Sequence, residues 1–186
     1  LLFINITSFH PMRQPQQEMT AGSKVFRKNY LNFVKKVVDY AHRFNVLVEG
    51  EIGVIGKDSN IRLLDCLKYV KLTNVDTFAP AIGNIHGQYV GEINLNLTLL
   101  EEINKNIKLP LVLHGASGID QTKISELINL GICKVNINTD LQIAWANGVR
   151  EKINLESNIY DPRKIINFGE ENIVKEIHEK LSIIGK

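Results

Sequence analysis

The fold is decided by the stretch LPLVLHGASG at residues 109–118. Its first half is an apolar run of strand length, and its second half is a polar turn that contains two glycines. Asp120 follows as a helix N-cap, because its carboxylate can accept a hydrogen bond from the first helical amides. The stretch therefore predicts a strand–turn–helix unit whose polar residues gather at the carboxyl end of the strand.

The same unit recurs on both sides of this stretch. Apolar strand candidates lie at residues 46–52, 77–83 and 133–137, and each is followed by apolar residues at helical spacing. A repeat of about 30 residues, strand then helix, is typical of parallel strands joined by crossover helices. We therefore expect an α/β fold.

The first 27 residues differ from this pattern. Residues 1–6 form an apolar run that can be a strand, and a polar segment interrupted by two prolines follows it. Proline removes a backbone donor and biases its predecessor away from helix. We therefore treat residues 1–27 as an atypical N-terminal arm, and residues 28–186 as the regular part of the chain.

Local signals predict where the later helices begin. Thr98 and Glu101 have the spacing of a capping box, and Asp140 is a candidate N-cap for a helix that runs to about residue 153. Asp161 and Pro162 predict the start of the last helix, because proline is well tolerated in the first helical turn.

The composition excludes several classes of protein. Of the 186 residues, 44% are hydrophobic and 23% are charged, and the net charge is only +2. Such a balance predicts no general attraction to nucleic acid or to acidic membranes. No apolar run approaches the ~20 residues of a membrane span, and no secretory leader is visible.

The two cysteines are too few for a disulfide framework or a zinc knuckle. Cys66 and Cys133 lie far apart in the sequence, with no second cysteine near either. This usage fits the reducing cytoplasm. We expect Cys133 to be a small buried side chain.

The strand ends collect the residues that can carry chemistry. They supply Glu49 and Glu51, then His86, then His114, and then the segment 136–139. Barrels and open α/β sheets place their chemistry at this edge. Two imidazoles with a carboxylate are a plausible partial shell for Zn²⁺, and a glycine- and hydroxyl-rich turn before a helix is suited to phosphate.

Each of these signals also has a purely structural interpretation. A single histidine at a strand end is usually a satisfied structural residue. Glu49 and Glu51 alternate, so they point to the same face, and that face can be a solvated strand rim. Turns such as Gly-Ala-Ser-Gly join many strands to helices without binding any ligand.

Five motifs, in order, resemble the class II fructose-bisphosphate aldolase family, whose motifs tagatose-bisphosphate and related ketose-bisphosphate aldolases share. They are residues 48–53 (VEGEIG), 79–89 (APAIGNIHGQY), 111–118 (LVLHGASG), 134–140 (KVNINTD) and 160–163 (YDPR). The resemblance covers about residues 28–186. It implies an incomplete (β/α)₈ TIM barrel, with strands five to eight and the C-terminal helices.

The resemblance also implies roles for particular residues. His86 and His114 match zinc-binding histidines, and Glu51 matches a carboxylate near the metal. The segments that hold dihydroxyacetone phosphate match Gly87, Gly115, Ala116, Ser117, Asn136, Ile137, Asn138 and Thr139. Arg163 resembles the arginine that meets the far phosphate of the substrate. The family's catalytic aspartate and a further zinc histidine lie on a His-Leu-Asp-His type motif in the first half of the barrel, and this sequence contains no such motif.

The resemblance thus implies zinc-dependent cleavage of a ketose 1,6-bisphosphate. For fructose 1,6-bisphosphate, the products are dihydroxyacetone phosphate and glyceraldehyde 3-phosphate. No lysine Schiff base is required, and a homo-oligomer is expected because family members are dimers or tetramers. The alternative is a non-catalytic half-barrel that retains metal or phosphate binding, or that acts as an interaction module. In the loop after residue 53, which in the family carries an acid/base glutamate, Asp58 is the nearest acid.

Overall fold

A computed structural model of the chain describes residues 3–6, 22–53, 61–89 and 91–184, with side chains from residue 29 onward. The elements, in chain order, are β1 (Phe3–Ile6), α1 (Gly22–His42), β2 (Leu47–Ile52), α2 (Leu63–Thr73), β3 (Thr77–Pro80), α3 (Leu97–Asn106), β4 (Leu111–Leu113), α4 (Gln121–Asn129), β5 (Ile132–Val135), α5 (Thr139–Leu155) and α6 (Pro162–Ile184).

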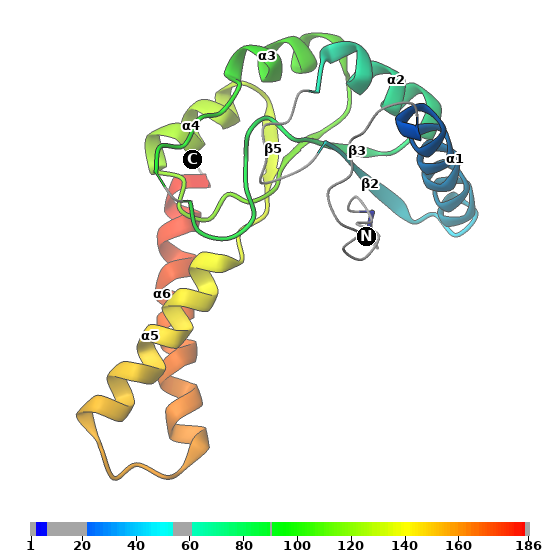
Figure 1. Ribbon diagram of the computed structural model, residues 1–186. Helices are drawn as coiled ribbons and strands as arrows, with labels where there is room; N and C mark the ends of the chain where they lie inside the picture. The colour runs from blue at the N-terminus through cyan, green and yellow to red at the C-terminus, as the bar shows by residue number, and fades with distance from the viewer. Residues whose placement is uncertain (1–2, 7–21, 54–60, 90, 185–186) are drawn as a thin grey trace.

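The strands form one parallel sheet in the order β1-β2-β3-β4-β5. Helices α1–α4 follow the outer side of this sheet as an arc (Figure 1). Strand and helix alternate, and each strand pairs with the next one along the chain, so the predicted α/β architecture of a partial barrel is confirmed. The apolar run at the N-terminus contributes β1, which makes five strands where the resemblance implied four.

The N-terminal arm is partly built into this body. Strand β1 pairs with β2 in the register Phe3 to Leu47, and α1 begins at Gly22 rather than at Lys28. The helix therefore starts within the arm that the sequence pattern set apart.

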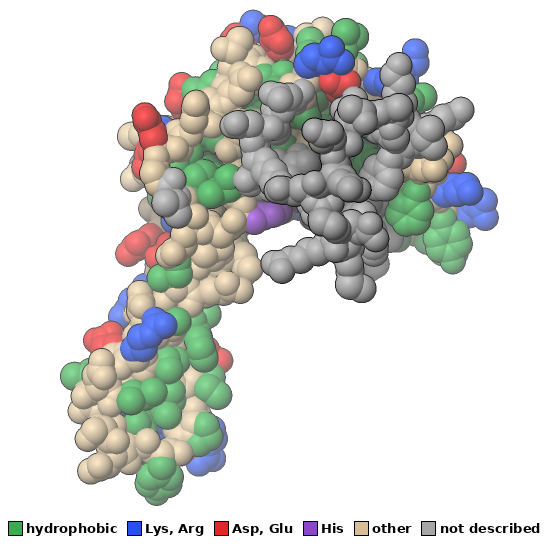
Figure 2. Space-filling view, viewed as in Figure 1, with side chains coloured by type: hydrophobic (Ala, Val, Ile, Leu, Met, Phe, Trp, Pro, Cys, Tyr) green, Lys and Arg blue, Asp and Glu red, His purple; other side chains and the backbone are tan. Residues whose placement is uncertain are grey.

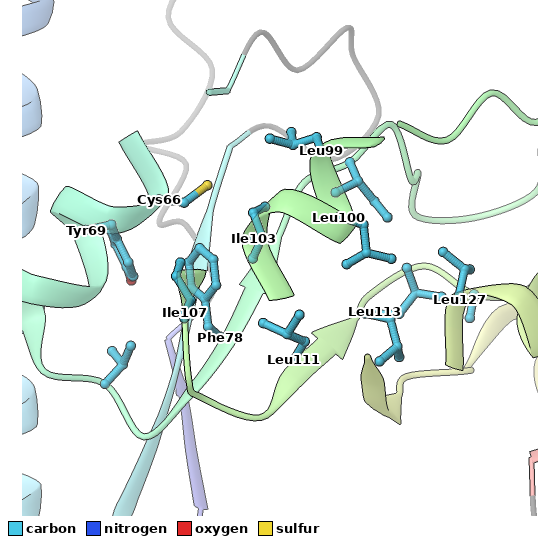
Figure 3. Packing of buried hydrophobic residues seen from close by; sticks show 14 of the residues in the cluster. Cys66, Tyr69, Phe78, Leu99, Leu100, Ile103, Ile107, Leu111, Leu113 and Leu127 are labelled. Atoms are coloured by element: carbon cyan, nitrogen blue, oxygen red, sulfur yellow. The ribbon is translucent and has the colours of Figure 1, made fainter. Parts of the chain in front are cut away.

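The hydrophobic core lies between the sheet and the arc of helices. Phe78 of β3 and Leu111 of β4 face Leu100 and Ile103 of α3, and Leu127 of α4 lies near the end of β4 (Figure 3). These side chains are fully or almost fully buried. Successive side chains of a strand point to opposite faces of the sheet. The residues that alternate with the core side chains, which include Glu49 and Glu51, therefore face the side away from the helices.

Two of the three predicted helix caps differ in the structure. Asp120 caps α4 as expected, because its carboxylate accepts from the Lys123 amide at 2.9 Å. Asn96, rather than Thr98, caps α3 by accepting from the Leu99 amide. Helix α5 has Asn138 at its N-cap. Asp140 lies in the first turn, and its carboxylate accepts a hydrogen bond from the Gly118 amide instead of capping the helix. The last helix begins at Pro162, as predicted.

Helices α5 and α6 form a hairpin that extends away from the body (Figure 1). Gly148 and Gly169 are its only buried helical residues among those the structure describes. A Cβ at Gly169 would lie 2.5 Å from Nε1 of Trp145, so the missing side chain lets the two helices approach closely. Within the described ranges, none of the helices has the length and apolar character that crossing a bilayer requires.

Candidate active site

His114 is the central side chain of the site. It follows β4, and its ring reaches across β3 to the two glutamates of β2. Nε2 lies 2.8 Å from Oε1 of Glu49, and Nδ1 lies 2.8 Å from Oε2 of Glu51. Ala79 is the β3 residue in register with Glu51, and its small side chain leaves room for this reach.

Glu49 and Glu51 are both buried, with exposed fractions of 0% and 2%. They point to the same face, as their alternation predicts, but the interpretation of that face as a solvated strand rim is wrong. A buried carboxylate requires charged or hydrogen-bonding partners, and the imidazole supplies one to each of them. Nζ of Lys134, from β5, supplies a second partner to Glu49 at 2.5 Å from Oε2.

These contacts perturb two pKa values. Burial lowers the pKa of His114, but the hydrogen bond to Glu49 and the proximity of Glu51 outweigh it and raise that pKa to about 9. Burial alone would raise the pKa of Glu49, yet the hydrogen bonds from His114 and Lys134 lower it. The network therefore favours an anionic Glu49 beside a cationic imidazole ring.

The loop after β3 brings His86 beside His114. Their ring centroids are 6.0 Å apart and the planes are inclined by 35°. Gly115 makes this approach possible: it has φ +63°, and a Cβ there would lie 1.9 Å from the carbonyl oxygen of Ile85. Only glycine fits a position where two backbones lie this close.

Two polar side chains fasten the same loop to the His114 turn. The Asn84 side-chain amide donates to the carbonyl of His114 at 2.8 Å, and its oxygen accepts from the Ile82 amide. The Tyr89 hydroxyl donates to the carbonyl of Gly115 at 3.0 Å and accepts from the Ile85 amide. The position of His86 is therefore held by buried and half-buried hydrogen bonds.

A cavity of about 500 Å³ opens beside the two histidines. Its lining residues are His86, Gly87, His114, Gly115, Ser117, Val135, Asn136, Ile137, Asn138 and Thr139. Histidine surface is visible in the hollow between the hairpin and the body (Figure 2). Three strand ends thus contribute to one space. Of the sequence-predicted site residues, Ala116 is buried behind the lining, and Glu51 lies behind His114.

The polar turn after β4 is tied to the segment after β5. Ser117 Oγ accepts from the amides of Asn138 and Asp140, at 3.3 and 3.2 Å. The Gly118 amide, at φ +80°, donates to Oδ2 of Asp140 at 3.1 Å. These bonds join the turn at residues 115–118 to the segment 136–140, and residues of both line the cavity.

Arg163 is not brought to this cavity. It lies at the start of α6, at the tip of the hairpin, and its guanidinium pairs with Asp161 at 2.9 Å with the side chain 86% exposed. Its role toward a distant phosphate stays a prediction. Residues 54–60, which contain Asp58, lie outside the described residues.

The residues present fit a metal ion in part. Two imidazoles that share one zinc ion, at about 2.0–2.1 Å from each nitrogen, have ring centroids roughly 5–6 Å apart, and the pair here lies at the upper end of that range. Both nitrogens of His114 already contact carboxylates, so a cation must displace one of these contacts. Across the described ranges, no three His, Cys, Asp or Glu side chains form a group that could hold a metal ion.

Sequence reasoning assigned no role to several residues of the site. Glu49 was among the strand-end candidates, and the strand period of two places it on the face of Glu51, but it received no specific role. Lys134, Asn84 and Tyr89 lie inside motifs that were recognised, but their partners are distant in the sequence. No local pattern indicates that Lys134 of β5 would meet a carboxylate of β2, three strands away in the sheet.

Comparison with known proteins tests the resemblance. Residues 16–186 match the family model described as fructose-bisphosphate aldolase class-II. The chain belongs to the class II fructose-bisphosphate aldolase family. The match begins inside the N-terminal arm, in agreement with the early start of α1.

Curated relatives show how much of their length the chain matches. It is 38% identical over 174 residues to a fructose-bisphosphate aldolase of Staphylococcus epidermidis, and 39% identical over 175 residues to that of Geobacillus stearothermophilus. Each alignment covers 89% of this chain, but only 60% and 58% of the relatives. The chain therefore spans about three fifths of the length of the curated relatives it matches.

Solved structures of aldolases share the fold. The YdjI aldolase of Escherichia coli K12 superposes with a TM-score of 0.73 at 27% identity, covering 99% of this chain and 59% of that one. The fructose-bisphosphate aldolase of Campylobacter jejuni gives a TM-score of 0.69 at 23% identity, covering 85% and 56%. The latter likeness supports the fold alone.

Proposed function

We propose that this chain forms the cation- and phosphate-binding side of a class II aldolase that cleaves a ketose 1,6-bisphosphate. For fructose 1,6-bisphosphate the products are dihydroxyacetone phosphate and glyceraldehyde 3-phosphate. One observation carries the proposal: His86 and His114, from successive strand ends, face one cavity whose other wall is the segment 136–139.

His86 and His114 would hold the divalent ion, with Glu51 beside them. The chemistry that a divalent ion held by these residues would supply is Lewis-acid polarisation of the ketone carbonyl of the substrate. Glu49 is engaged by Lys134 as well as by His114, which favours Glu51 as the carboxylate that turns toward a cation.

The turn at residues 115–118 and the segment 136–139 would hold the phosphate of dihydroxyacetone phosphate. Gly115 and Ser117 of the turn line the cavity together with residues 136–139, and a glycine- and hydroxyl-rich turn ahead of a helix is suited to phosphate. The family's proton-transferring aspartate belongs to a His-Leu-Asp-His type motif that this sequence does not contain, so the turn and the segment would bind and orient the substrate. Residues 28–186 would be the C-terminal part of the barrel, with residues 1–27 as the arm ahead of it.

Zinc binding tests the ligand assignment directly. His114→Ala should weaken zinc affinity by more than about tenfold, and at least as much as His86→Ala, because His114 is buried among carboxylates. Isothermal titration calorimetry with zinc measures the affinity, and circular dichroism verifies that each variant is folded. His178→Ala, on an exposed position of α6, is the matched control. Equal zinc stoichiometry and affinity in both variants and the parent would contradict the assignment.

A non-catalytic half-barrel is the second candidate. The sheet ends at β1 and β5 among the described strands, and no three-ligand metal group is assembled there. Exposed sheet edges pair readily with other chains, so such a protein would bind metal or phosphate, or act as an interaction module. Zinc-dependent cleavage of fructose 1,6-bisphosphate by the chain would favour the aldolase. Zinc binding without cleavage, even with added Zn²⁺, would favour the half-barrel.

A further inference from the structure

An ion pair joins the last turns of α6 to the first turn of α5, next to the cavity lining. Nζ of Lys180 lies 2.6 Å from Oδ2 of Asp140, and 3.3 Å from Oε1 of Glu176 on its own helix. The Lys180 and Asp140 side chains are only 22% and 16% exposed. Such an ion pair is less screened than one in open solvent. The pairing joins residues that lie forty positions apart in the sequence.

Asp140 carries this contact into the turn after β4. The same Oδ2 atom that meets Lys180 accepts the hydrogen bond of the Gly118 amide. The Asp140 amide in turn donates to Ser117 Oγ. Ser117 lines the cavity, so one carboxylate connects the C-terminal helix to the wall where phosphate is proposed to bind.

Apolar contacts run beside the ion pair. Lys180, Ile183 and Ile184 of α6 line one small gap together with Ala116 and Ile119 of the turn. Burial lowers the pKa of Lys180, but its pairing with Asp140 and Glu176 outweighs burial and raises that pKa. The ammonium group therefore stays charged at neutral pH, and the end of α6 is anchored at this point.

We infer that Lys180 is a positioning residue: through Asp140 it fixes the turn at residues 115–118 in the conformation that binds a phosphate group. The inference rests on the phosphate role proposed for that turn, and it adds the C-terminal helix to the determinants of the site. Gly115 and Gly118 both have positive φ, and glycine has the greatest conformational freedom of any residue. Such a turn depends on contacts from outside to keep its amides in place.

Binding of inorganic phosphate to the full chain tests the inference. Lys180→Met should weaken phosphate binding about five- to tenfold, and hydrogen exchange of the Gly118 amide should become faster. Lys180→Arg, which keeps the charge, should restore both to within about twofold of the parent. Zinc affinity should not change in either variant, because the ion pair does not involve His86, His114 or Glu51. NMR titration with phosphate and isothermal titration with zinc provide these readouts.

Two further variants distinguish a positioning role of Lys180 from a general effect of charge and from a failure of the variant to fold. Lys175→Met removes an exposed charge from the same helix, and should leave phosphate affinity and Gly118 exchange unchanged. Asp140→Asn keeps the size of the side chain but removes its charge, and should reproduce Lys180→Met if the latter does not fold.

The outcomes distinguish this inference from the proposed function. Phosphate affinity and Gly118 exchange that are the same with and without Lys180 would overturn the inference alone. An equal loss in Lys175→Met would also overturn it, since it would show a bulk charge effect. A parent chain that binds no phosphate would reject the phosphate role of the turn, and the inference with it, while leaving the zinc assignment to its own test.

Discussion

In the body of the molecule, α1–α4 share one hydrophobic core with the sheet, whereas α5 and α6 in the hairpin contact mainly each other. The body buries large side chains such as Tyr69, Phe78 and Leu100. The hairpin buries only two glycines and exposes a stripe of apolar residues on α6. The exposed apolar residues of α6 are Ile166, Val174, Ile177 and Leu181. The comparison shows that the core and most of the candidate site belong to the body, and that the hairpin reaches the site only with the first turn of α5 and the end of α6.

Truncation of one core side chain in each region gives the largest expected contrast. Phe78→Ala should lower the free energy of unfolding by about 3–5 kcal/mol, because it removes a fully buried ring and leaves a cavity. Leu181→Ala, at a position that is 56% exposed, should change it by less than about 0.5 kcal/mol. Urea denaturation measures both. A large loss for Leu181→Ala would break the comparison, because it would show that the apolar face of α6 is covered in solution.

Glycine substitutions test the close approaches in the two regions. Gly115→Ala should lower the free energy of unfolding by about 2–4 kcal/mol. The new Cβ would overlap the Ile85 carbonyl, and the alanine would have to adopt a left-handed backbone conformation. Gly169→Ala should cost about 1 kcal/mol or less, because the atom it meets belongs to the partly exposed Trp145 side chain, which can shift. Thermal unfolding of the two variants compares them. Equal losses would mean that the hairpin is packed as rigidly as the site.

Thiol labelling is the prediction with the smallest expected effect, and it tests how rarely the hydrophobic core opens to solvent. Burial raises the pKa of Cys66 to about 12, so at pH 8 only roughly one molecule in ten thousand carries the reactive thiolate. Cys133 is exposed on β5, so it should react with iodoacetamide in the native protein, while Cys66 should react only after unfolding. Mass spectrometry of labelled peptides identifies the site. Rapid native labelling of Cys66 would show that the core opens readily.

The accessible position of Cys133 also corrects a prediction, because the sequence indicated a small buried side chain. Strand β5 is the last strand of the described sheet, and its middle residues are exposed. Composition and periodicity identify a strand but do not reveal whether it has a neighbour on its far side. Burial at an edge strand depends on that neighbour.

The sequence by itself determined the order of strands and helices and the identity of the motifs at the strand ends. Apolar periodicity and glycine placement are local properties, so His86, His114 and the turn at residues 115–118 were recognisable without coordinates. The same holds for Asp120 as the cap of α4. Caps and bounds were predicted wrongly where a competing contact decided them, as at Asp140, whose carboxylate meets Lys180 and Gly118 instead of capping its own helix.

Only the tertiary structure decided which of these residues meet. The burial of Glu49, its pairing with Lys134, and the separation of Arg163 from the cavity all depend on sheet register and on the direction of the hairpin. A side chain's partner across several strands is set by the packing of the whole sheet. That packing minimises buried, unpaired charge over many residues at once, and no short stretch of sequence encodes it.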